Sequence, residues 1–184
     1  MAITRIISPS ITGLTIPNTS INNASLNSVT ALPSAVAVSN TPAFEAYLSS
    51  DQTISNNVTT KIQYNTEIYD TDSCYDNSSN YRFTPDVAGK YYVYSRSYVS
   101  ANASSNYLTT NHIYKNGSQV TDAIIDVRNN AGLQFSVFVY ATVIMNGSSD
   151  YVEAFSKSYV TGGSITVAGG GEQRNSFGAY RIIT

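Results

Sequence analysis

The segment that decides the fold is residues 83–99, which read F-T-P-D-V-A-G-K-Y-Y-V-Y-S-R-S-Y-V. Thr84, Pro85 and Asp86 favour a turn that ends at Gly89, and the residues after it alternate with the two-residue period of a β-strand. The first face of this predicted strand is formed by Tyr91, Val93, Ser95, Ser97 and Val99. The opposite face is formed by Tyr92, Tyr94, Arg96 and Tyr98. The pattern therefore predicts one mostly small, apolar face and one aromatic face.

The aromatic face has properties between those of a core and those of a solvent-exposed surface. Its rings are too large and apolar for an ordinary solvent-facing strand. Its hydroxyls and its guanidinium would all need hydrogen-bond partners inside a sealed core. Such a face suits a contact between subunits. The alternative interpretation is that the tyrosines only flank the sheet of a monomer.

Length and cysteine content bound the class of protein. A chain of 184 residues can form one domain with an appendage and can bury a core without disulfides or metals. The single cysteine, Cys74, cannot form a disulfide within the chain. No apolar run approaches the ~18 residues of a membrane span. The first residues lack the basic stretch and apolar core of a signal peptide. We therefore expect synthesis in a cytoplasm and no membrane partner.

The chain carries little charge. Charged residues make up 12% of it and the formal net charge is −2. Binding to phosphate groups needs clustered Lys and Arg, and the sequence contains no such cluster. These features argue against nucleic acid as a partner. A low charge content also suits a β-rich protein whose surface is largely covered in an assembly.

The N-terminal segment differs from the rest of the chain. Residues 6–44 contain no Asp, Glu, Lys or Arg and are interrupted by prolines. Their apolar residues are too widely spaced for a core and have no helical period. We predict that residues 1–43 form an extended arm that docks on other proteins. The side chains predicted to dock are Ile11, Leu14, Ile16, Ile21, Leu26 and Leu32.

Residues 44–184 are predicted to form a β-rich head. Turn signals rich in Asn, Ser and Gly separate predicted strands at 44–48, 58–64, 81–83, 89–99, 107–114, 119–127, 133–145, 151–157, 164–167 and 176–183. This pattern predicts an all-β, ten-stranded jelly-roll sandwich. In the strand 133–145, alternation places Leu133 and Phe135 on the core face, and Phe138 and Tyr140 on the outer face. A second aromatic outer face is therefore expected.

Four motifs in the head resemble the globular head domain of complement component 1q and its tumour-necrosis-factor relatives. They are Phe83-x5-Gly89-x-Tyr91-Tyr92, Tyr114-Lys115-Asn116-Gly117, Asp150-Tyr151-Val152 and Ser176-Phe177-Gly178. The resemblance implies a ten-stranded jelly roll that forms compact homotrimers, with Tyr92 and Tyr94 facing the three-fold axis. Phe138 and Tyr140 are expected to contribute to the same interface. The Asn-, Ser- and Thr-rich composition, without collagen repeats, resembles phage-borne members of this family.

Signals for catalysis are weak. His112 lies in a strand pattern without an accompanying Ser or Cys nucleophile motif. The glycines at 169–171 are not followed by the Lys and Ser or Thr of a phosphate-binding loop. Cys74 has only acidic residues nearby, whereas a reactive thiol needs a basic neighbour. We expect neither an enzyme nor a cofactor.

One acidic segment is a weak candidate for a metal site. Asp70, Asp72 and Asp76 lie in D-T-D-S-C-Y-D, and calcium prefers several oxygen ligands from one tight loop. The segment departs from the helix-loop-helix calcium pattern, because Tyr75 stands where that pattern needs Gly. The default interpretation is a solvated acidic loop without a metal.

Two non-enzymatic classes of function remain. The favoured one is a structural virion protein of a bacteriophage: a homotrimeric capsid decoration protein that docks through its arm, for instance on the major capsid protein, and stabilises the particle. It would be assembled in the host cytoplasm. The alternative is a tail fibre or spike head, or a receptor- or glycan-binding module whose tyrosines stack on a host-surface glycan.

Overall fold

The computed structural model describes residues 40–102, 106–129, 131–170 and 174–182. In this part of the chain the regular structure consists entirely of strands, and no helix is long and apolar enough to span a membrane. The strands are β1 (Ala43–Tyr47), β2 (Gln52–Ile54), β3 (Thr60–Lys61), β4 (Thr66–Asp70), β5 (Tyr75–Asp76), β6 (Arg82–Phe83), β7 (Gly89–Asn102), β8 (Asn106–Lys115), β9 (Ser118–Asp126), β10 (Gln134–Met145), β11 (Val152–Val160), β12 (Ser164–Val167) and β13 (Ser176–Ile182).

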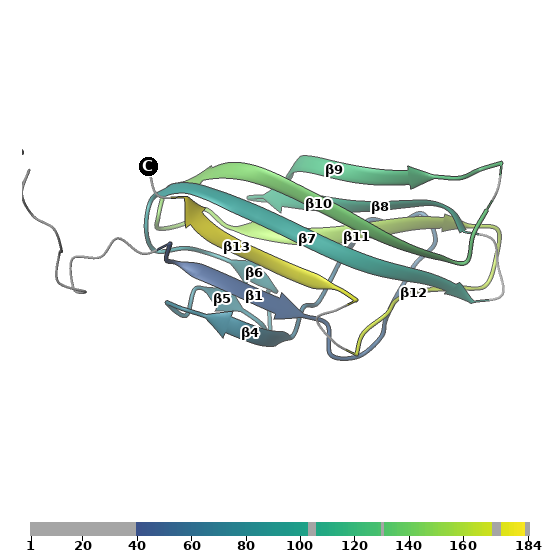
Figure 1. Ribbon diagram of the computed structural model, residues 1–184, viewed down its shortest axis with the longest axis horizontal. Helices are drawn as coiled ribbons and strands as arrows, with labels where there is room; N and C mark the ends of the chain where they lie inside the picture. The colour runs from purple at the N-terminus through teal and green to yellow at the C-terminus, as the bar shows by residue number, and fades with distance from the viewer. Residues whose placement is uncertain (1–39, 103–105, 130, 171–173, 183–184) are drawn as a thin grey trace, which may run out of the picture. The chain divides into compact units, whose positions relative to one another are not determined.

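The strands form two antiparallel sheets that pack face to face as a jelly-roll sandwich (Figure 1). Sheet A has the order β2-β12-β7-β13-β1-β4, and β10 pairs with the other edge of β7. Sheet B has the order β5-β6-β11-β8-β9, and β3 pairs with β11. The predicted all-β jelly roll is therefore confirmed, although the described residues contain thirteen strands rather than ten.

The additional strands are β2, β4 and β5, which no sequence signal predicted. Two of them contain only two or three residues, and β4 reads T-E-I-Y-D, which lacks an apolar alternation. Each gains its structure from a partner elsewhere in the chain: β2 pairs with β12, β4 with β1 and β5 with β6. The predicted strand 58–64 is correspondingly shorter, since only β3 is extended there.

The central strand of sheet A, β7, has the predicted alternation. Its core-facing side chains are all fully buried, and they are Tyr91, Val93, Ser95, Ser97 and Val99. The opposite face consists of half-buried side chains, namely Tyr92, Tyr94, Arg96 and Tyr98. The strand is held on both edges, because β10 pairs with it along residues 89–100 while β13 and β12 pair with its other edge. Because both of its edges are paired, β7 is the central strand of sheet A.

The partner strand β10 alternates in the same way, with one correction. Val137, Val139 and Val143 are buried, whereas Phe138 and Tyr140 are exposed, as predicted. Leu133 was expected in the core but is 56% exposed. The strand begins only at Gln134, so Leu133 belongs to the preceding turn, where the alternation of a strand does not apply.

An aromatic cluster anchors the end of the core at which β1 begins. Phe44 stacks on Tyr75 and on Phe83, with ring centroids 4.4 and 4.6 Å away, and meets Phe177 edge-on at 5.0 Å. Phe83 also meets Tyr91, at 5.8 Å. Each aromatic contact of this kind stabilises the fold by ~0.5–1.5 kcal/mol in addition to the stabilisation from buried apolar area. Phe83 and Phe177 belong to the sequence motifs, so those motifs mark core positions.

The space between the two sheets also contains a group of buried polar side chains. The buried Ser95 lies between Tyr64 and Asn111: its hydroxyl is 3.0 Å from the Tyr64 hydroxyl, and its carbonyl accepts a hydrogen bond from Asn111 Nδ2 at 3.1 Å. Burial raises the pKa of Tyr64. Because buried polar groups need partners, these contacts restrict how the two sheets can be placed against each other.

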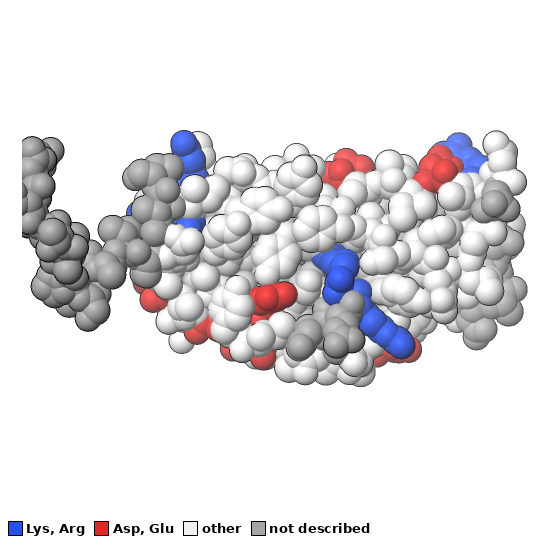
Figure 2. Space-filling model, viewed as in Figure 1, with Lys and Arg blue, Asp and Glu red and all other residues white. Residues whose placement is uncertain are grey.

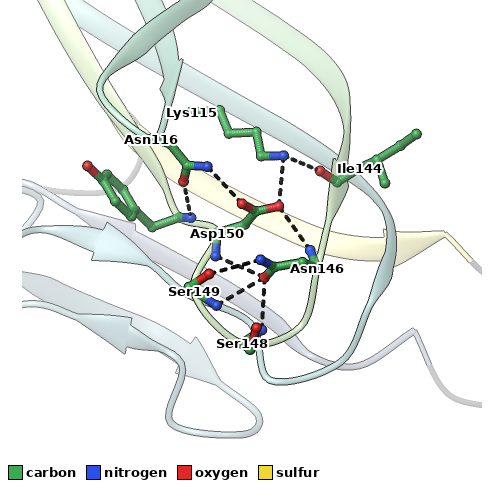
Figure 3. Close-up of polar contacts among 8 residues, drawn as sticks. Lys115, Asn116, Ile144, Asn146, Ser148, Ser149 and Asp150 are labelled. Atoms are coloured by element: carbon green, nitrogen blue, oxygen red, sulfur yellow. Dashed lines mark hydrogen bonds and ion pairs between the residues drawn. The ribbon is translucent and has the colours of Figure 1, made fainter.

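Two turns at one end of the sandwich are joined by side chains (Figure 3). Asp150 accepts hydrogen bonds from Asn116 Nδ2 at 2.7 Å and from the backbone of Asn146 at 3.0 Å, and it forms an ion pair with Lys115 at 2.8 Å. Asn116 Oδ1 in turn accepts from the backbone N–H of Tyr151 at 2.9 Å. The hydrogen bond and charge of Lys115 hold the pKa of Asp150 below its usual range. The motifs Tyr114–Gly117 and Asp150–Val152 therefore meet in space and join the β8–β9 turn to the β10–β11 turn.

Candidate functional site

The outer face of sheet A carries a continuous group of aromatic rings, which we call the aromatic face. It consists of Tyr92 and Tyr94 on β7, Phe138 and Tyr140 on β10, and Tyr180 on β13. On β10 and β13, the strands beside β7, the exposed fraction is 49% for Phe138, 60% for Tyr140 and 37% for Tyr180. These strands are adjacent in the sheet, so the four predicted interface residues are brought together on one surface.

The rings contact one another in a network. Tyr92 lies at the centre, with ring-centroid distances of 5.8 Å to Tyr140, 5.4 Å to Tyr180 and 6.1 Å to Tyr94. Phe138 lies 6.1 Å from Tyr140 and 6.4 Å from Tyr94. The register explains this arrangement, because Tyr92 is opposite Thr142 on β10 and opposite Tyr180 on β13, while Tyr140 is opposite Tyr94.

The orientation of the Tyr94 ring depends on the residue opposite it, Gly178. Gly178 faces Tyr94 across the β13–β7 pairing, and a Cβ atom at this position would lie 2.4 Å from the Tyr94 hydroxyl oxygen. The absence of a side chain lets the tyrosine ring lie flat across the neighbouring strand. Its hydroxyl thereby reaches Glu45 and Tyr69, and burial raises its pKa. Gly178 of the C-terminal motif is therefore needed for the shape of the aromatic face.

Charged groups are sparse on this side of the molecule. Figure 2 shows the surface over β7 and β10 as mostly uncharged, with a basic and an acidic patch near the middle of the view. A hollow of about 300 Å³ lies beside the aromatic face and is lined by Thr121, Asp122, Ala123, Phe138, Val139 and Tyr140. This hollow, at the edge between β10 and β9, could receive a large side chain of a partner protein.

Tyr180 is the member of the aromatic face that the sequence analysis missed. The signal was present, because alternation in the predicted strand 176–183 places Ser176, Gly178 and Tyr180 on one face. The pattern did not show that this strand pairs with the tyrosine strand. The pairing of Tyr180 with Tyr92 adds the ring to the group.

The predicted docking residues of the arm, namely Ile11, Leu14, Ile16, Ile21, Leu26 and Leu32, all lie outside the described residues. The docking role stays a prediction. Among the described residues the first strand begins at Ala43, next to the predicted start of the head at residue 44.

The structure does not bring the three candidate calcium ligands together. Asp70 accepts a hydrogen bond from the backbone of Tyr75 at 2.8 Å, and Asp72 accepts one from its neighbour Thr71 at 2.6 Å. The Asp76 carboxylate accepts hydrogen bonds from the backbone N–H groups of residues 78–80, and these bonds hold its pKa below the usual range. In the described ranges no group of three His, Cys, Asp or Glu residues is placed to share a metal ion. The segment is a turn in which each acid has its own local partner.

His112 and Cys74 lie in unrelated places. His112 is 7% exposed on the outer side of sheet B, where Nε2 contacts the Thr110 hydroxyl at 2.7 Å, and burial lowers its pKa. The Cys74 thiol is half-buried beside the backbone of Asp72, and burial raises its pKa. A raised thiol pKa leaves less of the reactive thiolate.

Comparison with known proteins gives a match in structure alone. No protein-family model matches the chain, and no curated protein matches its sequence. The fold is similar to the crystal structure of murine APRIL at pH 5.0, with a TM-score of 0.55 and 8% identity over 76% of this chain and 98% of that chain.

Two further solved structures agree with this match. Eiger TNF from S. frugiperda has a TM-score of 0.54 and 10% identity, covering 77% of this chain and 92% of that one. The globular domain of zebrafish complement 1qA has a TM-score of 0.51 and 12% identity, covering 77% and 97%. The head therefore has the jelly-roll fold of the tumour-necrosis-factor and complement-component-1q domains, as the sequence motifs predicted.

Proposed function

We propose that the protein is a homotrimeric capsid decoration protein of a bacteriophage, which docks on the shell through residues 1–43 and projects its jelly-roll head. The trimer is supported by the aromatic face. Soluble monomers rarely expose large contiguous apolar patches, and aromatic residues are enriched at protein interfaces. The exposed rings of Phe138, Tyr140 and Tyr180 form such a patch in one subunit.

A second copy of the same chain is the occupant that best fits this face. The patch combines aromatic rings with an adjacent hollow, so the same subunit offers both a projecting ring and a place to receive one. One charged side chain, Arg96, lies on the same face of β7, opposite Phe138. Three copies arranged around an axis would cover the rings of β7, β10 and β13 together.

The single observation that supports the docking role is the absence of charge from residues 6–44. A segment of this length without charged groups has little to keep it solvated and no periodic pattern with which to fold alone. Ordering it costs about 1–2 kcal/mol per residue in backbone entropy. Extensive contacts along a groove of a neighbouring protein, such as the major capsid protein, would offset this cost.

The test compares the full chain with a version that begins at Ala43. Both are added to capsids that lack decoration, and binding is measured by co-sedimentation. We expect the full chain to bind and to raise the resistance of the particles to heat. The shortened protein should trimerise but remain in the supernatant. Equal binding by the two proteins would contradict the docking role of the arm. It would favour a spike or fibre head that acts through its own surface.

A further inference from the structure

A second surface feature lies on sheet B, at the end of the head opposite to the start of β1. It is a cavity of about 600 Å³ lined by Asn57, Tyr107, Leu108, Arg128, Lys157 and Tyr159. The cavity lies where β8 begins and where β9 and β11 end, whereas β1 begins at the other end of the sandwich (Figure 1). Its volume lies in the range of small-molecule sites, roughly 300–1,000 Å³.

The cavity opens away from sheet A. Lys157 and Tyr159 alternate along β11 with Ser156, Ser158 and Val160, which are buried between the sheets. Their side chains therefore point outward from sheet B. Since the aromatic face is the outer side of sheet A, contact between subunits through that face would leave the cavity open to solvent.

One wall consists of two aromatic rings. The rings of Tyr107 and Tyr159 have centroids 5.2 Å apart and are tilted by 45° to each other. Tyr159 lies opposite Leu108 in the β11–β8 pairing, at a position where the register shifts. The tilted rings do not form a parallel slot that would sandwich a flat aromatic base. They present an angled apolar surface, which suits the C–H face of a puckered sugar ring.

Asn57 also lines the cavity, and its backbone is fixed against β11. The backbone N–H of Asn57 donates to the carbonyl of Ser158 at 2.8 Å, and Asn57 has a positive φ of 59°. The preceding Asn56 binds Val160 through two hydrogen bonds, at 2.9 and 3.0 Å. These bonds hold the backbone of the segment against the edge of β11. The side-chain amide of Asn57, a lining residue, has both donor and acceptor atoms.

The charge of the cavity favours an anion. Lys157 forms no ion pair with any acid in the part of the chain that the structure describes. Arg128 contacts Asp126 at 2.9 Å, but its side chain remains 68% exposed. Its guanidinium has five N–H donors, so it can bind a second acceptor. Two cations thus face one cavity in a chain whose net charge is −2.

We propose that this cavity binds an acidic saccharide. In this site a sugar ring packs on Tyr107 and Tyr159, its carboxylate pairs with Lys157 and Arg128, and its hydroxyls bond to the amide of Asn57. The site is independent of the docking arm.

The test uses the full-length protein and two tetrasaccharides in isothermal titration calorimetry. The hyaluronan tetrasaccharide contains glucuronate, and chitotetraose is a neutral oligosaccharide that serves as its matched control. We expect the hyaluronan tetrasaccharide to bind more tightly and chitotetraose to bind weakly. Adenosine monophosphate serves as a second control, because it is anionic but has a flat base.

The variants separate charge from stacking. Lys157→Gln should weaken binding of the hyaluronan tetrasaccharide about tenfold or more, because a charge-assisted hydrogen bond is lost. Tyr159→Ala should weaken binding of both tetrasaccharides, whereas Tyr159→Phe should keep it. Lys90→Gln removes the same charge at the other end of the head and should change nothing.

Several results would overturn the proposal. They are the absence of binding by the hyaluronan tetrasaccharide, equal binding by chitotetraose, binding of adenosine monophosphate as tight as that of the acidic tetrasaccharide, and equal losses in Lys157→Gln and Lys90→Gln. A loss confined to Lys157→Gln and Tyr159→Ala, with unchanged melting temperatures, would support it.

Discussion

Replacing Tyr140 with alanine tests the subunit contact without disturbing the subunit itself. The Tyr140 side chain is 60% exposed on β10, so its removal leaves no cavity in the core of the head. Its ring contacts are with Tyr92 and Phe138, which are also at the surface. A folded but less associated protein is therefore the expected outcome.

The magnitude follows from the exposed area of the ring. A tyrosine side chain buries about 200 Å² when fully covered, so an exposed fraction of 60% corresponds to about 120 Å² available for the interface. At ~25 cal/mol per Å², covering this area contributes ~3 kcal/mol per subunit and ~9 kcal/mol per trimer. Because the trimer dissociates into three chains, this loss would raise the concentration at the midpoint of dissociation by about a thousandfold.

The assay is analytical ultracentrifugation over a range of concentrations, with Tyr159→Ala as the matched control. Tyr159 is a tyrosine of similar exposure, 43%, but it lies on the outer face of sheet B. We expect Tyr140→Ala to shift the protein toward monomers, while Tyr159→Ala remains trimeric. The two variants should show the reverse pattern in saccharide binding.

Two results would refute the reasoning. One is a wild-type protein that sediments as a monomer at micromolar concentration. The other is an equal effect of Tyr140→Ala and Tyr159→Ala on association, which would show that the rings act through general surface properties rather than through the aromatic face.

Three other predictions concern the residues that shape the head. Gly178→Ala should lower the free energy of unfolding by ~1–3 kcal/mol in denaturant titrations and weaken association, because its Cβ would displace the Tyr94 ring; the double variant with Tyr94→Ala should relieve the clash. Asn116→Ala should destabilise the head by ~1–3 kcal/mol, since it removes the hydrogen bonds to Asp150 and Tyr151 and leaves alanine at a φ of 51°. Asn116→Gly removes the same hydrogen bonds without the backbone strain. Equal losses of unfolding free energy in the two variants would refute the strain contribution. The pKa of Asp76 is lower in the folded state than in the unfolded state, so its ionised carboxylate stabilises the fold above the unfolded-state pKa of about 4, and this stabilisation is lost as the pH falls toward the folded-state pKa. The urea midpoint of Asp76→Asn should therefore fall less between about pH 4 and 2 than that of the wild type. Parallel curves of urea midpoint against pH would contradict this assignment.

Local patterns were sufficient to predict the fold class and most of the proposed interface. The alternation in residues 89–99 and 133–145 assigned Tyr92, Tyr94, Phe138 and Tyr140 to the outer face, because successive side chains of any strand point to opposite sides. The four motifs indicated the jelly roll correctly. The structure shows why they are informative: Phe83 and Phe177 pack in the core, Gly178 accommodates Tyr94, and Asn116 and Asp150 join two turns.

Other features depend on residues that are far apart in the chain, and only the tertiary structure decided them. The short strands β2 and β4 exist because distant strands supply their hydrogen bonds, and Tyr180 joins the aromatic face because β13 pairs with β7. The sheet B cavity combines Asn57, Tyr107, Arg128 and Lys157 from separate segments. A local pattern records which way a side chain points relative to its own strand, whereas a site is defined by which strands become neighbours. That choice is made by burial and hydrogen bonding across the whole sandwich.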